Sequence, residues 1–112
     1  MNTATATATT TDICALEDIV PWTGVAALIG ERQVAVFRFG GQVFALGNYD
    51  PIGQAFVLSR GLLGTAGTTP FVASPLYKQR FDLRTGACLD DPAVRVPTYP
   101  VQVVAGRILI DA

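Results

Sequence analysis

The sequence predicts a small all-β domain, built as an antiparallel β-barrel or β-sandwich. Short apolar runs rich in Val, Ile, Leu and Phe are separated by turns that contain Gly, Pro, Asn or Asp. That pattern is typical of strands joined by hairpins. No stretch shows sustained helical periodicity. Half of the 112 residues are hydrophobic and 15% are charged, so we expect one buried core.

The sequence pattern of the N-terminal half predicts four strands. The first covers Ile13 to Leu16, and the second covers Gly24 to Ile29 and ends at a Gly-Glu pair. The third, Gln33 to Phe39, is rich in Val and Phe, which favour strands. Gly40-Gly41 then leads into the fourth strand, Gln42 to Leu46. Because both glycines can adopt positive φ, this pair predicts a hairpin.

The C-terminal half begins with an irregular segment. Asn48 to Gly67 is rich in glycine and alternates little, so we expect a long loop with one short strand near Leu62-Leu63. Thr69 to Ala73 resembles a buried strand. Two further hairpins are predicted, with turns at Arg84-Thr85-Gly86 and at Ala105-Gly106. Their strands are Gln79–Leu83, Ala87–Leu89, Tyr99–Val104 and Arg107–Asp111.

We expect one domain from residue 12 to residue 112, preceded by a disordered tail of residues 1–11. This tail is almost entirely Thr and Ala, and it lacks the charged start and apolar centre of a signal peptide. The longest apolar runs are too short to span a bilayer. Sparse cysteine and the absence of a secretory signal predict a cytoplasmic protein without membrane partners.

Net charge and cysteine content argue against two further classes of function, nucleic-acid binding and metal binding by cysteines. The net charge of −1 gives no electrostatic footprint for nucleic acid, which requires a basic surface. Cys14 and Cys88 lie far apart and belong to no metal-ligand pattern. Their strand-like contexts favour buried cysteines that act as small hydrophobic side chains. A disulfide or a reactive thiol is the alternative.

No catalytic residues are predicted. The chain has no histidine, which excludes catalysis of the Ser-His or Cys-His kind. Ser74 and Lys78 form a conceivable Ser-Lys pair, but a structural serine beside a solvated lysine fits a loop better. Asp90-Asp91, followed by Pro92, could serve acid–base chemistry or hold a cation. It is more typical of a turn.

Basic residues gather in two loop regions. Half of the Lys and Arg residues of the chain lie there. They are either scattered solvated charges or a docking patch for an acidic face on a partner protein. The four residues are Arg60, Lys78, Arg80 and Arg84.

Ser74-Pro75-Leu76-Tyr77, followed by Phe81-Asp82-Leu83 and Thr85-Gly86, is similar to the second ligand loop of a Rieske iron–sulfur domain. That loop has the pattern Cys-Pro-x-His and continues into a hairpin. Asn48-Tyr49-Asp50 resembles the first loop, Cys-x-His. The resemblance implies an antiparallel Rieske-like β-sandwich or barrel with a hairpin subdomain of the kind that binds the cluster.

The ligand positions of that family are changed in this chain. A Rieske centre takes two Cys thiolates and two His imidazoles. The resemblance places Asn48, Asp50, Ser74 and Tyr77 at these positions. Their amide, carboxyl and hydroxyl groups match an iron–sulfide cluster poorly, because the cluster prefers thiolate. We therefore expect no cofactor and no metal on this chain.

Several longer runs carry a more specific resemblance. They include Gln33–Arg38, Phe44–Pro51, Val57–Gly61, Ala73–Gln79 and Cys88–Pro92. These runs resemble the small subunit of the assimilatory NAD(P)H-dependent nitrite reductases, and the resemblance covers essentially all of residues 12–112. It implies a non-catalytic subunit of a cytoplasmic enzyme that reduces nitrite to ammonium, with FAD, siroheme and a 4Fe-4S cluster on a large partner subunit.

Two other functions stay open at this point. One is electron transfer through an unusual Rieske-type cluster, and the other is a free-standing interaction module for another oxidoreductase. For the accessory subunit, we expect the ring of Tyr77 to fill the former cluster cavity. Its hydroxyl would then bond to Asp50 or Asn48. This contact would replace the metal as the crosslink between the two loops.

Overall fold

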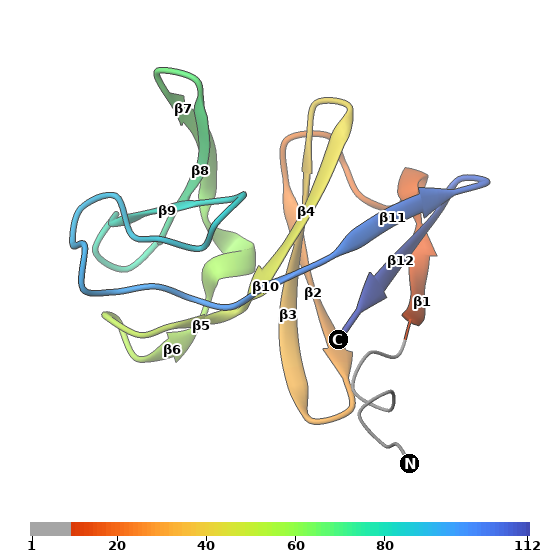
Figure 1. Ribbon diagram of the computed structural model, residues 1–112, viewed down its shortest axis with the longest axis horizontal. Coiled ribbons are helices and arrows are strands. Elements are labelled where there is room, and N and C mark those ends of the chain that lie inside the picture. Colours follow the sequence, from red (N-terminus) through yellow and green to blue (C-terminus); the bar gives the residue numbers. More distant parts are fainter. Residues whose placement is uncertain (1–9) are drawn as a thin grey trace, which may run out of the picture.

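The computed structural model describes residues 10–112, and within this range the chain is almost entirely strand and turn (Figure 1). The predicted antiparallel all-β class is confirmed. The elements are β1 (Thr10–Ala15), η2 (Leu16–Asp18), β2 (Gly24–Ile29), β3 (Arg32–Phe39), β4 (Gln42–Gly47), β5 (Tyr49–Asp50), β6 (Ala55–Phe56), η3 (Leu58–Arg60), β7 (Leu62–Ala66), β8 (Thr69–Ala73), β9 (Arg80–Asp82), β10 (Thr98–Tyr99), β11 (Val101–Val104) and β12 (Arg107–Asp111).

The first strand starts earlier than the sequence predicted. Thr10 pairs with Asp111, and the hydroxyl of Thr10 donates to that carboxylate over 2.6 Å. Residues 10 and 11 of the expected tail are therefore part of β1. The rest of that tail, residues 1–9, lies outside the described residues. No helix within residues 10–112 is long and apolar enough to cross a membrane.

The strands form two groups around a central sheet (Figure 1). The central sheet has the order β10-β4-β3-β2, and the sheet β1-β12-β11 lies on one side of it. The small β5-β6 pair and the sheet β7-β8-β9 lie on the other side. All strand pairs are antiparallel.

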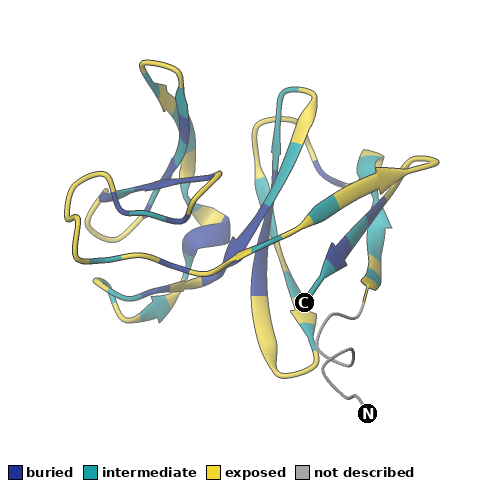
Figure 2. Cartoon of the chain, in the orientation of Figure 1, coloured by how far each residue is buried: buried dark blue, intermediate teal, exposed yellow. Residues whose placement is uncertain are grey.

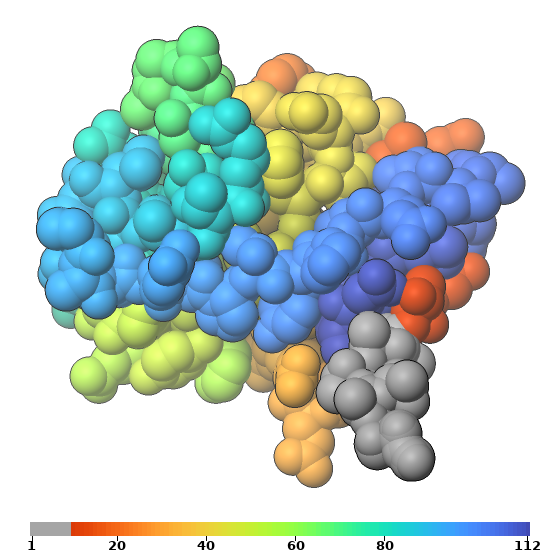
Figure 3. Space-filling model, in the orientation of Figure 1, coloured from red at the N-terminus to blue at the C-terminus, as the bar shows by residue number. Residues whose placement is uncertain are grey.

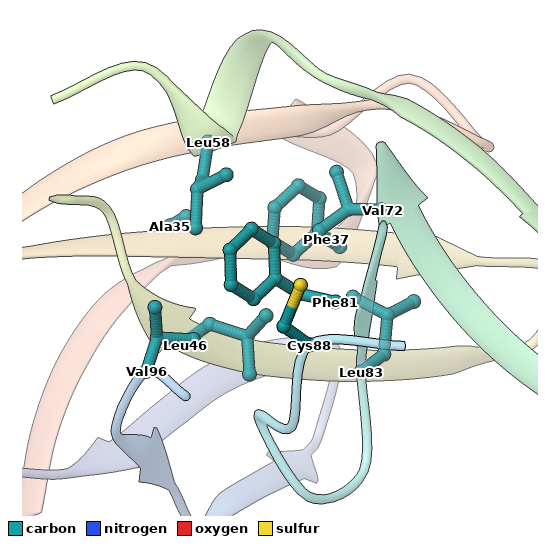
Figure 4. Close-up of a cluster of buried hydrophobic side chains, with 9 residues drawn as sticks. All are labelled: Ala35, Phe37, Leu46, Leu58, Val72, Phe81, Leu83, Cys88 and Val96. Atoms are coloured by element: carbon teal, nitrogen blue, oxygen red, sulfur yellow. The ribbon is translucent and has the colours of Figure 1, made fainter. Parts of the chain in front are cut away.

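Strand β3 is buried on both of its faces, which explains its unbroken apolar run. Val34 and Val36 belong to one core, and Ala35 and Phe37 belong to another. The first, which we call the terminal-side core, also contains residues of β12. The second, the loop-side core, joins the central sheet to η3, β8 and β9 (Figures 2 and 4). Its buried members are Ala35, Phe37, Leu46, Leu58, Val72, Phe81, Leu83, Cys88 and Val96.

Both cysteines are free, so the disulfide alternative is excluded. Cys88 is buried in the loop-side core, and Cys14 is half-buried against the terminal-side core. Burial, followed by the nearby charge of Asp18, raises the pKa of the Cys14 thiol. The thiolate of Cys14 is therefore disfavoured. The predicted burial holds for Cys88, whereas Cys14 is only partly buried.

The segment between β4 and β8 is more ordered than a long loop. It contains the β5-β6 pair, the turn η3 and the five-residue strand β7. The second predicted hairpin is shorter than expected, because only the single bridge between Phe81 and Cys88 forms. The amide of Cys88 donates to Val94 instead, so this segment turns back toward β10.

Candidate functional site

Two loops meet at the end of the domain that carries β5 and β6. The first follows β4 and contains Asn48, β5 and the turn into β6. The second runs from Ser74 to Gln79, between β8 and β9. Its ends are tied together, because the amide of Ser74 donates to the carbonyl of Gln79 over 2.9 Å. The predicted counterparts of the two ligand loops therefore lie together.

Asp50 joins these loops through its carboxylate, which is completely buried. Oδ1 accepts bonds from the amides of Ile52 (2.9 Å) and Gly53 (3.0 Å) in its own loop. Oδ2 accepts from the hydroxyl of Ser74 (2.6 Å) and from Nε2 of Gln79 (2.6 Å) in the other loop. We call Asp50, Ser74 and Gln79 the loop lock.

The loop lock keeps Asp50 ionised. Burial has the largest single effect on the pKa of Asp50 and raises it. The hydrogen bonds from Ser74, Gly53, Ile52 and Gln79 together outweigh burial, so the pKa lies below its ordinary value of 3.8. A buried carboxylate with this many donors is a satisfied charge, and it holds the two loops in one arrangement.

Asn48 anchors the first loop to the central sheet. Its Oδ1 accepts from the amide of Ser59 over 2.7 Å, and its Nδ2 donates to Oε1 of Gln33 over 3.2 Å. Like Asp50, it is buried. Asn48, Asp50 and Ser74, three of the four residues that the sequence resemblance places at ligand positions, thus form an inward-facing polar layer.

The expected role of Tyr77 is wrong. Its side chain is 72% exposed, and within residues 10–112 it makes no hydrogen bond to Asp50 or Asn48. Lys78, with φ at +63°, reverses the chain after Tyr77. This turn directs Gln79 inward, so the amide of Gln79 makes the contact expected of the phenol.

The two conceivable catalytic pairs are structural. Ser74 is buried and its hydroxyl is committed to Asp50, while Lys78 is exposed. Asp90 pairs with Arg80, and Asp91 accepts from the amide of Ala93 in a turn. Among residues 10–112, no group of three or more His, Cys, Asp or Glu side chains is placed to hold a metal ion.

The four basic residues do not form one cluster. Arg80 pairs with Asp90 over 2.8 Å and lies over the ring of Phe71. Arg84 lies two residues beyond the end of β9, whereas Arg80 is the first residue of that strand. The guanidinium of Arg84 donates to the hydroxyl of Thr69. Arg60 and Lys78 are exposed and belong to no ion pair among the described residues.

The fold and the two loops define the Rieske-like class. The sequence pattern of the Rieske-like [2Fe-2S] domain matches residues 9–111. The chain is 48% identical over 99 residues to the nitrite reductase (NADH) small subunit of Escherichia coli K12, covering 87% of this chain and 92% of that protein. The solved NMR structure of the E. coli protein NirD superposes with a TM-score of 0.87 at 44% identity, covering 94% of this chain and 97% of that one. The chain belongs to the nitrite reductase small subunits of the Rieske-like domain family.

A further relative is much longer. The chain is 51% identical over 98 residues to part of the nitrite reductase [NAD(P)H] large subunit of Klebsiella oxytoca. This match covers 88% of the present chain but spans only 10% of the length of that protein.

The residues present do not fit the [2Fe-2S] cluster that the family description implies. The carboxylate of Asp50 is saturated by donors, and the hydroxyl of Ser74 is one of them. Tyr77 faces solvent, and Cys88 lies in the loop-side core. Asp50, Ser74 and Tyr77 therefore supply neither thiolate nor imidazole, and one buried cysteine cannot replace the two Cys and two His ligands of a Rieske centre.

Proposed function

We propose that this chain is the non-catalytic small subunit of a cytoplasmic NAD(P)H-dependent nitrite reductase. It binds and supports a large subunit that reduces nitrite to ammonium. The observation that carries this proposal is the identity of 48% with a nitrite reductase small subunit over 92% of that protein. The chemistry of nitrite reduction then resides entirely on the partner, with FAD, siroheme and a 4Fe-4S cluster.

The Klebsiella relative supports physical association with the large subunit. There, a segment 51% identical to this chain is part of the large-subunit protein itself. Two domains that are covalently joined in one organism and separate in another commonly contact each other. The loop lock supports the accessory role, because the carboxylate of Asp50 and the hydroxyl of Ser74 are both engaged by hydrogen bonds within the domain.

The test is co-purification from the native host. A tag on this chain should capture a large subunit that contains flavin and siroheme, and iron should be found only on that subunit. Deletion of this chain should lower nitrite-dependent NAD(P)H oxidation. Capture of no such subunit would overturn the proposal.

The electron-transfer alternative makes the opposite prediction for the isolated chain. A Rieske-type carrier would be coloured and would contain stoichiometric iron. We expect the purified domain to be colourless and iron-free, because the former ligand positions hold the oxygen-bearing groups of Asn48, Asp50, Ser74 and Tyr77.

A further inference from the structure

Exposed apolar side chains surround the loop lock. Outside it, five large hydrophobic residues on the two joined loops are more than one-third exposed. We call them the tip surface. They are Tyr49, Ile52, Phe56, Leu76 and Tyr77.

The tip surface is continuous across the two loops. The rings of Tyr49 and Phe56 meet edge to face with centroids 5.0 Å apart, between β5 and β6. Leu76, from the other loop, covers Gly53, where an added Cβ would lie 2.6 Å from its Cδ1. Gly53 is next to Ile52, and both backbone amides bind Asp50. The lock therefore holds the apolar side chains of both loops in one arrangement.

This arrangement suits the binding of another protein. An aromatic centre that is already rigid loses little conformational entropy on association. Tyr and Phe are enriched in the centres of protein interfaces, where they contribute much of the binding energy. In Figure 3, the β5-β6 hairpin forms the lower left corner of the molecule, well away from the sheet that contains the terminal strands.

The charges beside the tip surface indicate the chemistry of its partner. Lys78 directly follows Tyr77, and Arg60 ends η3, whose next residue, Gly61, packs against the end of β8. Neither belongs to an ion pair within residues 10–112. Two nearby carboxylates are already engaged, since Asp50 is in the lock and Asp90 binds Arg80. A third, on Glu31, lines the hollow beside Tyr49 and Phe56 together with the basic Arg32 and Arg95. The surface is thus apolar at its centre and positive at its edge.

We propose that the tip surface docks on the large subunit, at an apolar hollow bordered by carboxylates that face Arg60 and Lys78. This inference rests on the proposed function and adds the contact face and its chemistry. Of the basic patch predicted from sequence, only these two residues take part. Arg80 already pairs with Asp90, and Arg84 lies beyond the other end of β9.

The experiment measures the affinity of the intact large subunit for variants of the full chain. Tyr77→Asp places a charge at the centre of the tip surface, and Lys78→Glu reverses a charge at its edge. The matched control is Leu28→Asp on β2, because Leu28 is 71% exposed and Tyr77 is 72% exposed. Urea unfolding of each variant shows that the fold is retained.

We expect Tyr77→Asp to weaken binding about tenfold or more, as substitutions at an interface centre commonly do. Lys78→Glu should weaken it at low salt more than at high salt, since salt screens exposed charges. Leu28→Asp should bind like the wild type. If the wild type binds but Tyr77→Asp binds equally well, or if Leu28→Asp is equally impaired, the docking face is wrong while the proposed function stands. If the wild type does not bind the large subunit at all, both proposals are overturned.

Discussion

The carboxylate of Asp50 receives hydrogen bonds from donors on two separate loops. Its two oxygens accept from Ile52, Gly53, Ser74 and Gln79. The hydroxyl of Ser74 and Nε2 of Gln79 are buried, so both donors depend on this single acceptor. Asp50 thus crosslinks the two loops through hydrogen bonds, as a metal ion crosslinks the loops that carry its ligands.

Replacement of the carboxylate should destabilise the domain strongly. Asp50→Ala leaves two buried donors, on Ser74 and Gln79, without an acceptor, and we expect a loss of about 3 kcal/mol or more in the free energy of unfolding. Tyr77→Ala is the matched control in the neighbouring loop, and it should change stability by less than about 0.5 kcal/mol, as exposed substitutions do. Urea titration at neutral pH measures both. Equal effects of the two substitutions would contradict the loop lock.

The stabilisation by Asp50 should depend on pH in one direction. Its pKa is lower in the folded state than the ordinary value of 3.8, so ionised Asp50 favours folding. The contribution is complete above this ordinary value and is lost as the pH falls through the lower folded value. The stability difference between wild type and Asp50→Ala should therefore be constant near neutral pH and shrink below about pH 4. Urea unfolding over this range measures it, and a difference that persists undiminished at about pH 3 would refute the assignment.

At the scale of elements, the turn before β10 depends on one glycine. Gly86 has φ at +80°, and a Cβ there would collide with the carbonyl oxygen of Val96. Its amide donates to Asp82 and its carbonyl accepts from Val96, so the turn fixes two segments. A side chain at this position meets both backbone strain and a backbone clash, which the turn cannot relieve by rotating a side chain.

We expect Gly86→Ala to destabilise the domain by at least about 2 kcal/mol. The control is Gly41→Ala in the β3-β4 turn, where an added Cβ meets nothing within 4 Å and φ is not left-handed. That variant should lie within about 1 kcal/mol of the wild type. Thermal or urea unfolding distinguishes them. Equal stability of the two variants would show that the turn at Gly86 can accommodate a Cβ, which would contradict the prediction.

Strong local signals in the sequence predicted the elements best. The bounds of β2 and β8 agree with the prediction, and the Gly40-Gly41 hairpin forms between β3 and β4. The β5-β6 pair was missed because its two-residue strands are too short to show a period of two. Its turn is closed by local bonds from Ile52 and Gly53 to Asp50, and Asp50 is itself held by tertiary bonds from Ser74 and Gln79, which leave no local pattern.

The site was predicted in position but not in its contacts. The family resemblance indicated Asn48, Asp50 and Ser74, and these do lie buried at the meeting of the loops. Gln79 was missed because its direction depends on the positive φ of Lys78, a residue type that rarely adopts it. No motif marked this turn.

At the scale of the whole molecule, strands β3 and β4 both contribute side chains to the two cores. Val36 and Phe37 are adjacent on β3 and point into opposite cores, and both are fully buried. Disruption of either core therefore disturbs the strand that supports the other. Unfolding of the loop end of the domain, which carries the loop lock and the tip surface, would disrupt the loop-side core and with it the central sheet.

The domain should therefore unfold in a single transition. Far-UV circular dichroism and the fluorescence of Trp22, which packs on Phe39, should give the same urea midpoint. Phe37→Ala should lower stability by about 3–5 kcal/mol. Val36→Ala, in the opposite core, should shift the same transition to a smaller extent. Two separate transitions, each sensitive to only one substitution, would contradict this cooperativity.

The loop lock also has a consequence for how the cell makes this subunit. Its crosslink consists of a carboxylate, a hydroxyl and an amide, all supplied by the chain itself as it folds. For a subunit without a cluster, as we propose, folding of these loops needs no iron and no machinery that builds and inserts clusters. Expression of the chain in iron-limited cells should therefore leave its yield and its thermal stability unchanged.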